Sequence, residues 1–169
     1  MSVGSYTTRT KVAGLKFYGW LPAMVRQRLV RALKPSYTVG SMTAVTRADG
    51  AVLHVRHSYF AEWALPGGLV NRREPIDLGA IRETREECGI EVLLVGEAAV
   101  TVDPRKQIVR VIYRAELAPG FDHTDARPAS EEIVEVAWFA PGTVVDVSPD
   151  SIAALEALER SERQQRHPG

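Results

Sequence analysis

The chain has 169 residues with no net formal charge, of which 45% are hydrophobic and 25% are charged, and this composition suits one globular domain with an ample core. Its single cysteine excludes an internal disulfide, and we expect Cys88 to be a buried thiol. No apolar run reaches the roughly 18 residues of a membrane span, and the first residues lack the apolar core of a secretion signal, so we expect a cytoplasmic protein.

Residues 1–34 are predicted to be a basic segment outside the main domain. Residues 1–60 carry nine Lys or Arg against a single acid, Asp49. An amphipathic helix is expected to start near Pro22, and its apolar residues are Trp20, Leu21, Met24, Val25, Leu29, Val30 and Leu33. Such a helix could touch a membrane surface, an anionic substrate or a nucleic acid. We favour packing on the domain or on a second subunit, which leaves a homodimer open and predicts no nucleic-acid partner.

From residue 37 the pattern changes to β-strands. Residues 37–46 and 51–58 flank Arg-Ala-Asp-Gly, which predicts a hairpin turn. Further strands are expected at 62–65, 91–102, 107–117 and 133–139, and a long loop at 118–129. Pro66-Gly67-Gly68 predicts a sharp turn whose backbone can approach a ligand closely.

Two helices are predicted within this domain. Residues 75–88 form one, with Leu78, Ile81 and Cys88 on its apolar side, and Gly89 ends it. Ser148 is expected to cap the other, whose inner face is formed by Ile152, Leu155 and Leu158. The predicted domain therefore covers residues 35–160, and residues 161–169 form a polar tail.

Three carboxylates are expected on the side of the first helix opposite its apolar residues. At about 100° per residue, Glu83, Glu86 and Glu87 fall within one arc. Like charges at this spacing destabilise a helix, and a hard divalent cation such as Mg²⁺ would offset the repulsion with its oxygen-ligand preference. Arg82 could pair with Glu86 or with the loop carboxylate Glu74. The alternative is a solvated acidic face balanced by arginines.

The spacing of seven residues in this region resembles the Nudix box of the Nudix hydrolases. The matching residues are Gly68, Glu74, Arg82, Glu83, Glu86, Glu87 and Gly89, and Thr84 is the one departure, because the pattern prefers an apolar side chain there. The resemblance covers residues 37 to about 158. It implies an α/β (α+β) fold, an α/β/α sandwich with a central mixed β-sheet.

The resemblance also implies roles for the box residues. Glu83, Glu86 and Glu87 would bind Mg²⁺, or Mn²⁺, together with the Gly68 carbonyl, and Glu74 would act as a supporting or outer-shell carboxylate. Arg82 would orient the carboxylates. The group that accepts the proton from water would be a box glutamate or an acid on the loop before the last strand, where Glu131 and Glu132 lie closest to that strand and Asp122 and Asp125 are also available.

The reaction that the family implies is hydrolysis of a nucleoside diphosphate linked to another moiety, with ADP-ribose or a nucleotide sugar preferred. A nucleoside triphosphate, as in the house-cleaning pyrophosphohydrolases, is the nearest rival, and a nucleotide-sensing domain without hydrolysis is a further alternative. Substrate contacts are expected from Arg56 and His57, although Arg56 could be a surface charge and His57 a structural hydrogen-bonding group. Aromatic side chains that could stack on a base are Trp63, Phe60, Tyr113 and Trp138.

Overall fold

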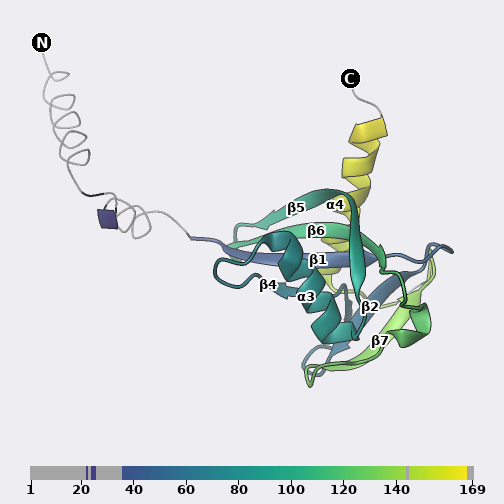
Figure 1. Cartoon of the computed structure of the whole chain (residues 1–169). Helices are drawn as coiled ribbons and strands as arrows, with labels where there is room; N and C mark the ends of the chain where they lie inside the picture. The colour runs from purple at the N-terminus through teal and green to yellow at the C-terminus, as the bar shows by residue number, and fades with distance from the viewer. Residues whose placement is uncertain (1–21, 23, 26–35, 144, 167–169) are drawn as a thin grey trace, which may run out of the picture. The chain divides into compact units, whose positions relative to one another are not determined.

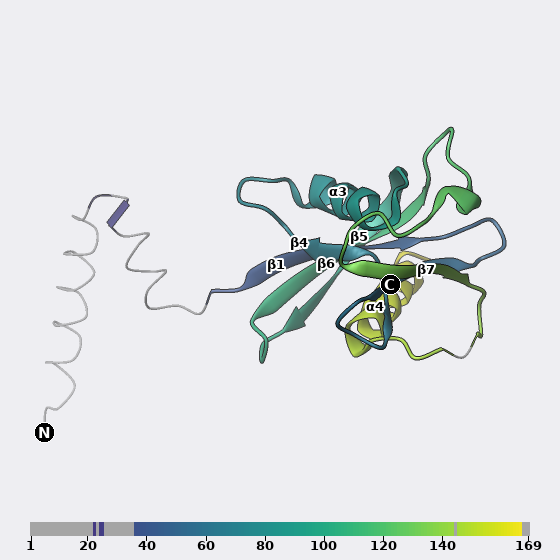
Figure 2. The same ribbon diagram turned by 90° about the horizontal axis from the view of Figure 1, so that it is seen from below.

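Two β-sheets lie between helices α3 (Ile76–Cys88) and α4 (Pro149–Arg166), which cover opposite faces (Figures 1 and 2). The computed structural model describes residues 22, 24–25, 36–143 and 145–166. Apart from residues 22, 24 and 25, the predicted amphipathic helix in residues 1–34 lies outside these ranges. The strands and the short 3₁₀-helix are β1 (Thr38–Val45), β2 (Val52–His57), β3 (Trp63–Ala64), β4 (Gly67–Leu69), β5 (Val92–Asp103), β6 (Ile108–Leu117), η1 (His123–Asp125) and β7 (Ile133–Phe139). The predicted sandwich with a mixed sheet is confirmed.

The larger sheet is mixed and has the strand order β4-β1-β6-β5. β1 runs parallel to β6, from Thr38 opposite Ile108 to Val45 opposite Ala115, and antiparallel to β4. Its last six residues are all buried, as expected for a strand with parallel pairing and helices on both faces. β1 is therefore the strand against which the rest of this sheet is assembled.

The smaller sheet is antiparallel, with the order β3-β2-β7, and it corrects the predicted hairpin. The turn at residues 47–50 does form, because the Gly50 amide donates to the Arg47 carbonyl over 2.9 Å. However, β1 and β2 then enter different sheets, and they share only an isolated bridge between Thr46 and Val52. Turn residues reverse the chain locally, whereas the pairing partner is decided by burial, and both edges of β1 are taken by β4 and β6.

Each helix covers its own hydrophobic cluster. The cluster under α4 contains Met42, Ala44, Leu65, Ala99, Ile112, Ala154, Ala157 and Leu158. The cluster that includes the end of α3 contains Val45, Leu53, Val55, Cys88, Ile90, Val92, Ala115 and Ile133. Cys88 is fully buried, as predicted, and burial raises the pKa of its thiol. Among the described helices, none is long and apolar enough to cross a membrane.

The buried faces of both helices match the predicted ones in part, since Ile81 and Cys88 of α3 and Leu155 and Leu158 of α4 belong to or pack against the clusters. Leu78 is 54% exposed and Ile152 46% exposed, whereas Ala80 and Thr84 of α3 are fully buried. α3 packs closely on β1 through small residues, and the Thr84 hydroxyl lies 2.7 Å from that of Thr43. Close packing against a sheet thus favoured small side chains over the larger apolar ones from which the face was predicted. The Thr84 departure from the family pattern is a hydrogen-bonded contact between helix and sheet.

Ser148 caps α4 as predicted, because the Ser151 amide donates to the Ser148 hydroxyl over 3.3 Å. The Ser151 hydroxyl in turn accepts a hydrogen bond from the Leu65 amide over 2.9 Å. This contact ties the start of α4 to the chain just before β4. α4 also continues to Arg166, so most of the predicted tail is helical.

Candidate active site

A short strand, β4, brings the two glycines of the predicted turn against β1. Gly67 pairs with Met42, and Gly68 pairs with Ser41. A Cβ atom on Gly67 would lie 2.3 Å from the Ser41 carbonyl oxygen, so no larger residue fits there without moving β1. A Cβ atom on Gly68 would lie 2.6 Å from the carboxyl carbon of Glu83. The Glu83 carboxylate of α3 therefore lies directly against the backbone of Gly68.

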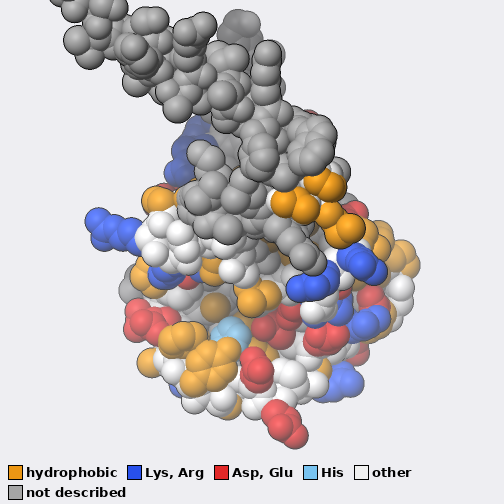
Figure 3. All heavy atoms as spheres, turned by 90° about the vertical axis from the view of Figure 1, so that its left-hand side faces the viewer, with side chains coloured by type: hydrophobic (Ala, Val, Ile, Leu, Met, Phe, Trp, Pro, Cys, Tyr) orange, Lys and Arg blue, Asp and Glu red, His pale blue; other side chains and the backbone are white. Residues whose placement is uncertain are grey.

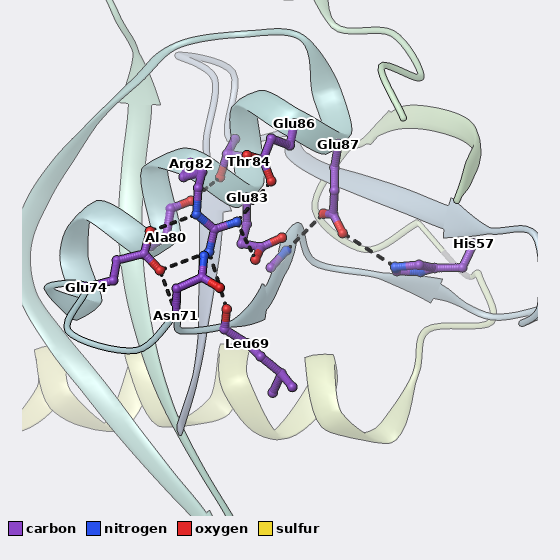
Figure 4. Close-up of polar contacts among 11 residues, drawn as sticks. His57, Leu69, Asn71, Glu74, Ala80, Arg82, Glu83, Thr84, Glu86 and Glu87 are labelled. Atoms are coloured by element: carbon purple, nitrogen blue, oxygen red, sulfur yellow. Dashed lines mark hydrogen bonds and ion pairs between the residues drawn. The ribbon is translucent and has the colours of Figure 1, made fainter. Parts of the chain in front are cut away.

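Arg82 lies at the centre of the glutamate cluster (Figure 4). Its Nε and Nη2 donate to the two carboxylate oxygens of Glu74 over 2.7 and 3.0 Å. Its Nη1 donates to Glu83 over 2.7 Å and to Glu86 over 2.9 Å, and Nη2 also donates to the Leu69 carbonyl over 3.3 Å. Arg82 thus pairs with both partners that the sequence left open, and it holds three carboxylates and β4 in one arrangement.

These contacts and burial shift the pKa values of the clustered groups in different directions. Hydrogen bonds from Arg82, with a further one from the Asn71 amide, lower the pKa of Glu74 to about 2. The same pairing with Glu74 is the main cause that raises the pKa of Arg82. Burial raises the pKa of Glu83, although Arg82 opposes this effect. Glu74 is therefore firmly ionised, whereas the charge on Glu83 is costly in the absence of a further cation.

Glu87 links the glycine strand to the smaller sheet. Its side chain is nearly buried, with 8% of the residue exposed, and one carboxylate oxygen accepts a hydrogen bond from the Gly67 amide over 3.0 Å. The other oxygen lies 3.5 Å from Nε2 of His57, at the end of β2 (Figure 4). His57 and the helix carboxylates, far apart in the sequence, are thereby brought to one place.

The donor set fits a hard divalent cation. The four glutamates carry four negative charges when ionised, and Arg82 offsets one of them. Among the described residues, no three acidic, histidine or cysteine side chains converge as a complete metal site, since oxygens of Glu83 and Glu86 face Arg82. This is compatible with Mg²⁺, which commonly takes one or two carboxylates and completes its shell with water and substrate phosphate.

A cavity of about 530 Å³ opens beside this cluster. Gly67, Gly68 and His57 line it near the carboxylates, and Tyr59 and Phe60 line it in the loop after β2. The far wall contains a polar group formed by Lys106, Arg110 and Asp150, in which Asp150 accepts hydrogen bonds from both cations. On the face turned to the viewer in Figure 3, hydrophobic and acidic side chains adjoin a histidine.

Two residues that line the cavity each have one buried polar atom without a hydrogen-bond partner in the described part of the chain. These atoms are the hydroxyl oxygen of Ser41 and Nδ1 of His57. Buried polar groups are usually satisfied by protein or ordered water, and the Ser41 hydroxyl lies on the α3 side of β1, close to Gly79.

The other predicted substrate residues lie elsewhere. Arg56 forms an ion pair with Glu135 of β7, and its guanidinium carbon lies 5.6 Å from the ring centroid of Trp63. Trp63 also packs edge-on against Phe139, with 4.9 Å between ring centroids. The structure thus brings Arg56 and Trp63 to each other, while His57 is the one of the three that lines the cavity.

The two candidate bases, Glu131 and Glu132, are both exposed on the loop before β7. Glu132 accepts a hydrogen bond from the Tyr59 hydroxyl over 3.4 Å, and its backbone carbonyl accepts one from the Ser58 amide over 2.8 Å. The pKa of Tyr59 is raised by burial, and further by the charges of Glu132 and Glu87. Sequence reasoning missed Tyr59, although adjacent aromatic residues directly after a strand were a visible signal.

Comparison with known proteins agrees with this geometry. The family model described as NUDIX domain matches residues 36–159. A MutT-like protein of Streptomyces ambofaciens is 30% identical over 127 residues, which cover 74% of this chain and 79% of that protein. A protein of Bacillus subtilis (strain 168), whose name proposes an 8-oxo-dGTP diphosphatase, is 27% identical over 106 residues, or 63% of this chain and 68% of that protein.

Comparison of the fold with solved structures also finds Nudix hydrolases. The crystal structure of a NUDIX hydrolase from Nitrosomonas europaea superposes with a TM-score of 0.64 at 25% sequence identity, and the match covers 79% of this chain and 74% of that one. The family match spans most of the chain and includes every glutamate of the cluster around Arg82. The chain therefore belongs to the Nudix family, whose members are pyrophosphatase hydrolases that act on diphosphate bonds.

Proposed function

We propose that this chain is a Mg²⁺-dependent pyrophosphohydrolase that cleaves a nucleoside diphosphate linked to another moiety, with ADP-ribose or a nucleotide sugar preferred. The observation that carries the proposal is the cavity of about 530 Å³ that reaches Gly68, where the Glu83 carboxylate lies against the backbone. Small-molecule sites typically enclose about 300–1,000 Å³, so a nucleotide fits this volume.

In this proposal Glu83, Glu86 and Glu87 hold the cation together with the Gly68 carbonyl, and Glu74 supports them through Arg82. A bound Mg²⁺ or Mn²⁺ would supply a water of lowered pKa and offset negative charge on the leaving phosphate. Arg82 holds the carboxylates of Glu83 and Glu86 next to each other, and the Gly67 amide and His57 hold that of Glu87. The protein's own contribution is to fix these oxygens beside the cavity before the substrate arrives.

Glu132 is the better placed of the two loop acids to accept the proton from the attacking water, because it accepts a hydrogen bond from Tyr59, which lines the cavity. We expect Glu132→Gln to lower kcat by about a hundredfold or more, which is typical for the loss of a general base. Glu131→Gln is the matched control, since it makes the same change at the adjacent exposed position. Steady-state kinetics on both variants tests this, and equal kcat values would leave a box glutamate as the base.

The names of the relatives favour a second candidate, a nucleoside triphosphate. The Streptomyces protein is described as MutT-like, and the name of the Bacillus protein specifies 8-oxo-dGTP. A nucleotide sensor without hydrolysis is the third candidate, but the chain keeps all four box glutamates. The cytoplasmic location, the separate basic segment 1–34 and a homodimer stay predictions.

A substrate panel tests the proposed function. Release of nucleoside monophosphate from ADP-ribose, nucleotide sugars and nucleoside triphosphates, with 8-oxo-dGTP included, is measured with Mg²⁺, with Mn²⁺ and after exhaustive chelation. We expect cleavage of a diphosphate bond that is lost on chelation and restored by either cation, because the cluster offers hard oxygen donors. Cleavage that persists after chelation contradicts the metal role, and nucleotide binding without any cleavage supports the sensor.

A further inference from the structure

An exposed aromatic pair forms part of the cavity wall. Tyr59 and Phe60 follow β2 directly, and 59% and 61% of their surfaces are exposed. Both line the cavity that reaches Gly67 and Gly68. Large aromatic side chains are usually buried where they stabilise a fold, so two adjacent exposed rings at a cavity mouth need another explanation.

The pair is held in place from the side of the glutamate cluster. The ring centroids of Tyr59 and Phe60 are 4.8 Å apart in an edge-on arrangement. His57 packs against both rings, with its centroid 5.2 Å from that of Tyr59 and 6.3 Å from that of Phe60. Because His57 also lies 3.5 Å from the Glu87 carboxylate, the aromatic wall adjoins the place where the diphosphate is expected.

The two rings differ in what else they contact. The Tyr59 hydroxyl donates to Glu132, which ties that ring to the loop before β7. Phe60 has no polar atom and belongs to neither hydrophobic cluster described above, and its backbone amide closes a turn onto the His57 carbonyl over 3.4 Å. Within the described part of the chain, Phe60 therefore presents an exposed aromatic face that is supported from one side by the Tyr59 and His57 rings and can contact a flat ligand.

We propose that Phe60 stacks on the base of the nucleotide, so that the nucleoside half of the substrate lies at the β2–β3 loop and the diphosphate reaches Gly68. This assignment rests on the proposed function. Stacking suits the ring, because bases have a π-face and an aromatic residue gains stacking free energy with little ordering cost when its position is already fixed. The other half of the substrate then lies toward Lys106, Arg110 and Asp150, where polar groups are available.

Binding of nucleoside monophosphates tests the assignment separately from catalysis, because these molecules contain no diphosphate to cleave. AMP, GMP, UMP and CMP are titrated into the wild-type protein with Mg²⁺ by calorimetry, and the best-bound one is compared with inorganic pyrophosphate. In Phe60→Ala we expect the Kd of the nucleotide to rise about tenfold or more, while the Kd of pyrophosphate stays the same. Phe60→Trp should restore nucleotide binding, since it restores the aromatic face.

Phe121→Ala is the matched control. It removes the same side chain from a partly exposed position, 37% exposed, that does not line the cavity. Equal nucleotide affinity in the wild type and Phe60→Ala overturns the stacking assignment, as does a wild-type protein that binds none of the four monophosphates. Equal weakening for nucleotide and pyrophosphate also overturns it, because a collapsed loop would affect both ligands.

A failure of the stacking assignment can be distinguished from a failure of the proposed function. A protein whose nucleotide binding depends on Phe60 but which hydrolyses nothing in the substrate panel would keep the stacking contact and lose the enzymatic proposal. In an active enzyme, Phe60→Ala should raise KM for the nucleotide substrate about tenfold or more with a much smaller change in kcat, because stacking acts equally on the bound substrate and on the transition state.

Discussion

Replacement of Glu87 by glutamine is expected to lower kcat about a hundred- to a thousandfold while the free energy of unfolding changes by about 1 kcal/mol or less. The amide keeps an oxygen that can accept the hydrogen bond from the Gly67 amide, and it removes one charge from a crowded acidic face. Turnover, in contrast, loses a carboxylate proposed to bind the cation when charge develops on the phosphates. The measurements are kcat at saturating Mg²⁺ and unfolding in urea.

The control for this variant is Glu159→Gln on α4, whose side chain is 65% exposed and lies outside the glutamate cluster. It should alter neither kcat nor stability. If Glu87→Gln keeps wild-type turnover at saturating metal, Glu87 is not a ligand. If the variant is unfolded instead, Glu87 acts mainly as a structural link between α3, β4 and His57.

The substitutions Gly67→Ala and Gly68→Ala are expected to have different effects, the first on stability and the second on kcat. At Gly67 the new Cβ would lie 2.3 Å from the Ser41 carbonyl oxygen and 2.8 Å from the Met42 Cα, both in the backbone of β1. We expect this overpacking to lower the free energy of unfolding by about 3 kcal/mol or more. At Gly68 the three atoms nearest to the new Cβ would all belong to the Glu83 carboxylate, at 2.6–2.7 Å, and a side chain can move aside.

Gly68→Ala should therefore fold with nearly wild-type stability and lose about a hundredfold in kcat, the cost expected when a catalytic group is displaced by about 1 Å. Each variant is the control for the other, since both add one methyl group to β4. Urea unfolding and kcat are measured on both. A Gly68→Ala protein with full activity would show that the contact between Glu83 and Gly68 has no role in the reaction.

The elements that depend on local spacing were predictable from the sequence. α3 begins and ends within a residue of its predicted limits, because Pro75 and Gly89 are local signals, and Gly89 adopts a left-handed conformation with φ of 70°. The strand ranges β5, β6 and β7 follow from their residue patterns alone. The approach of Glu74 to Arg82 was also indicated, since Glu74 lies just before the helix that carries Arg82.

The features that depend on distant contacts were not predictable in this way. β4 consists largely of glycine, so its residues carry no strand pattern, and it exists because β1 offers an edge to pair with. The division into two sheets also depends on distant contacts, because β4 and β6 take both edges of β1, while β2 pairs with β3 and β7. Arg56 lies beside Trp63 because the two residues pair across β2 and β3, whereas its ion pair with Glu135 comes from β7, and no spacing in the sequence encodes that second neighbour.

The parallel pairing of β1 with β6 has a consequence for synthesis on the ribosome. Residues Thr38–Val45 pair with Ile108–Ala115, so one edge of β1 has no partner until the chain beyond residue 108 has emerged. The acidic helix α3 and the glycines of β4 are made earlier, at about 5–20 residues per second. Pairings between distant residues also form slowly. The nascent chain therefore exposes its four clustered glutamates before the sheet that supports them is complete.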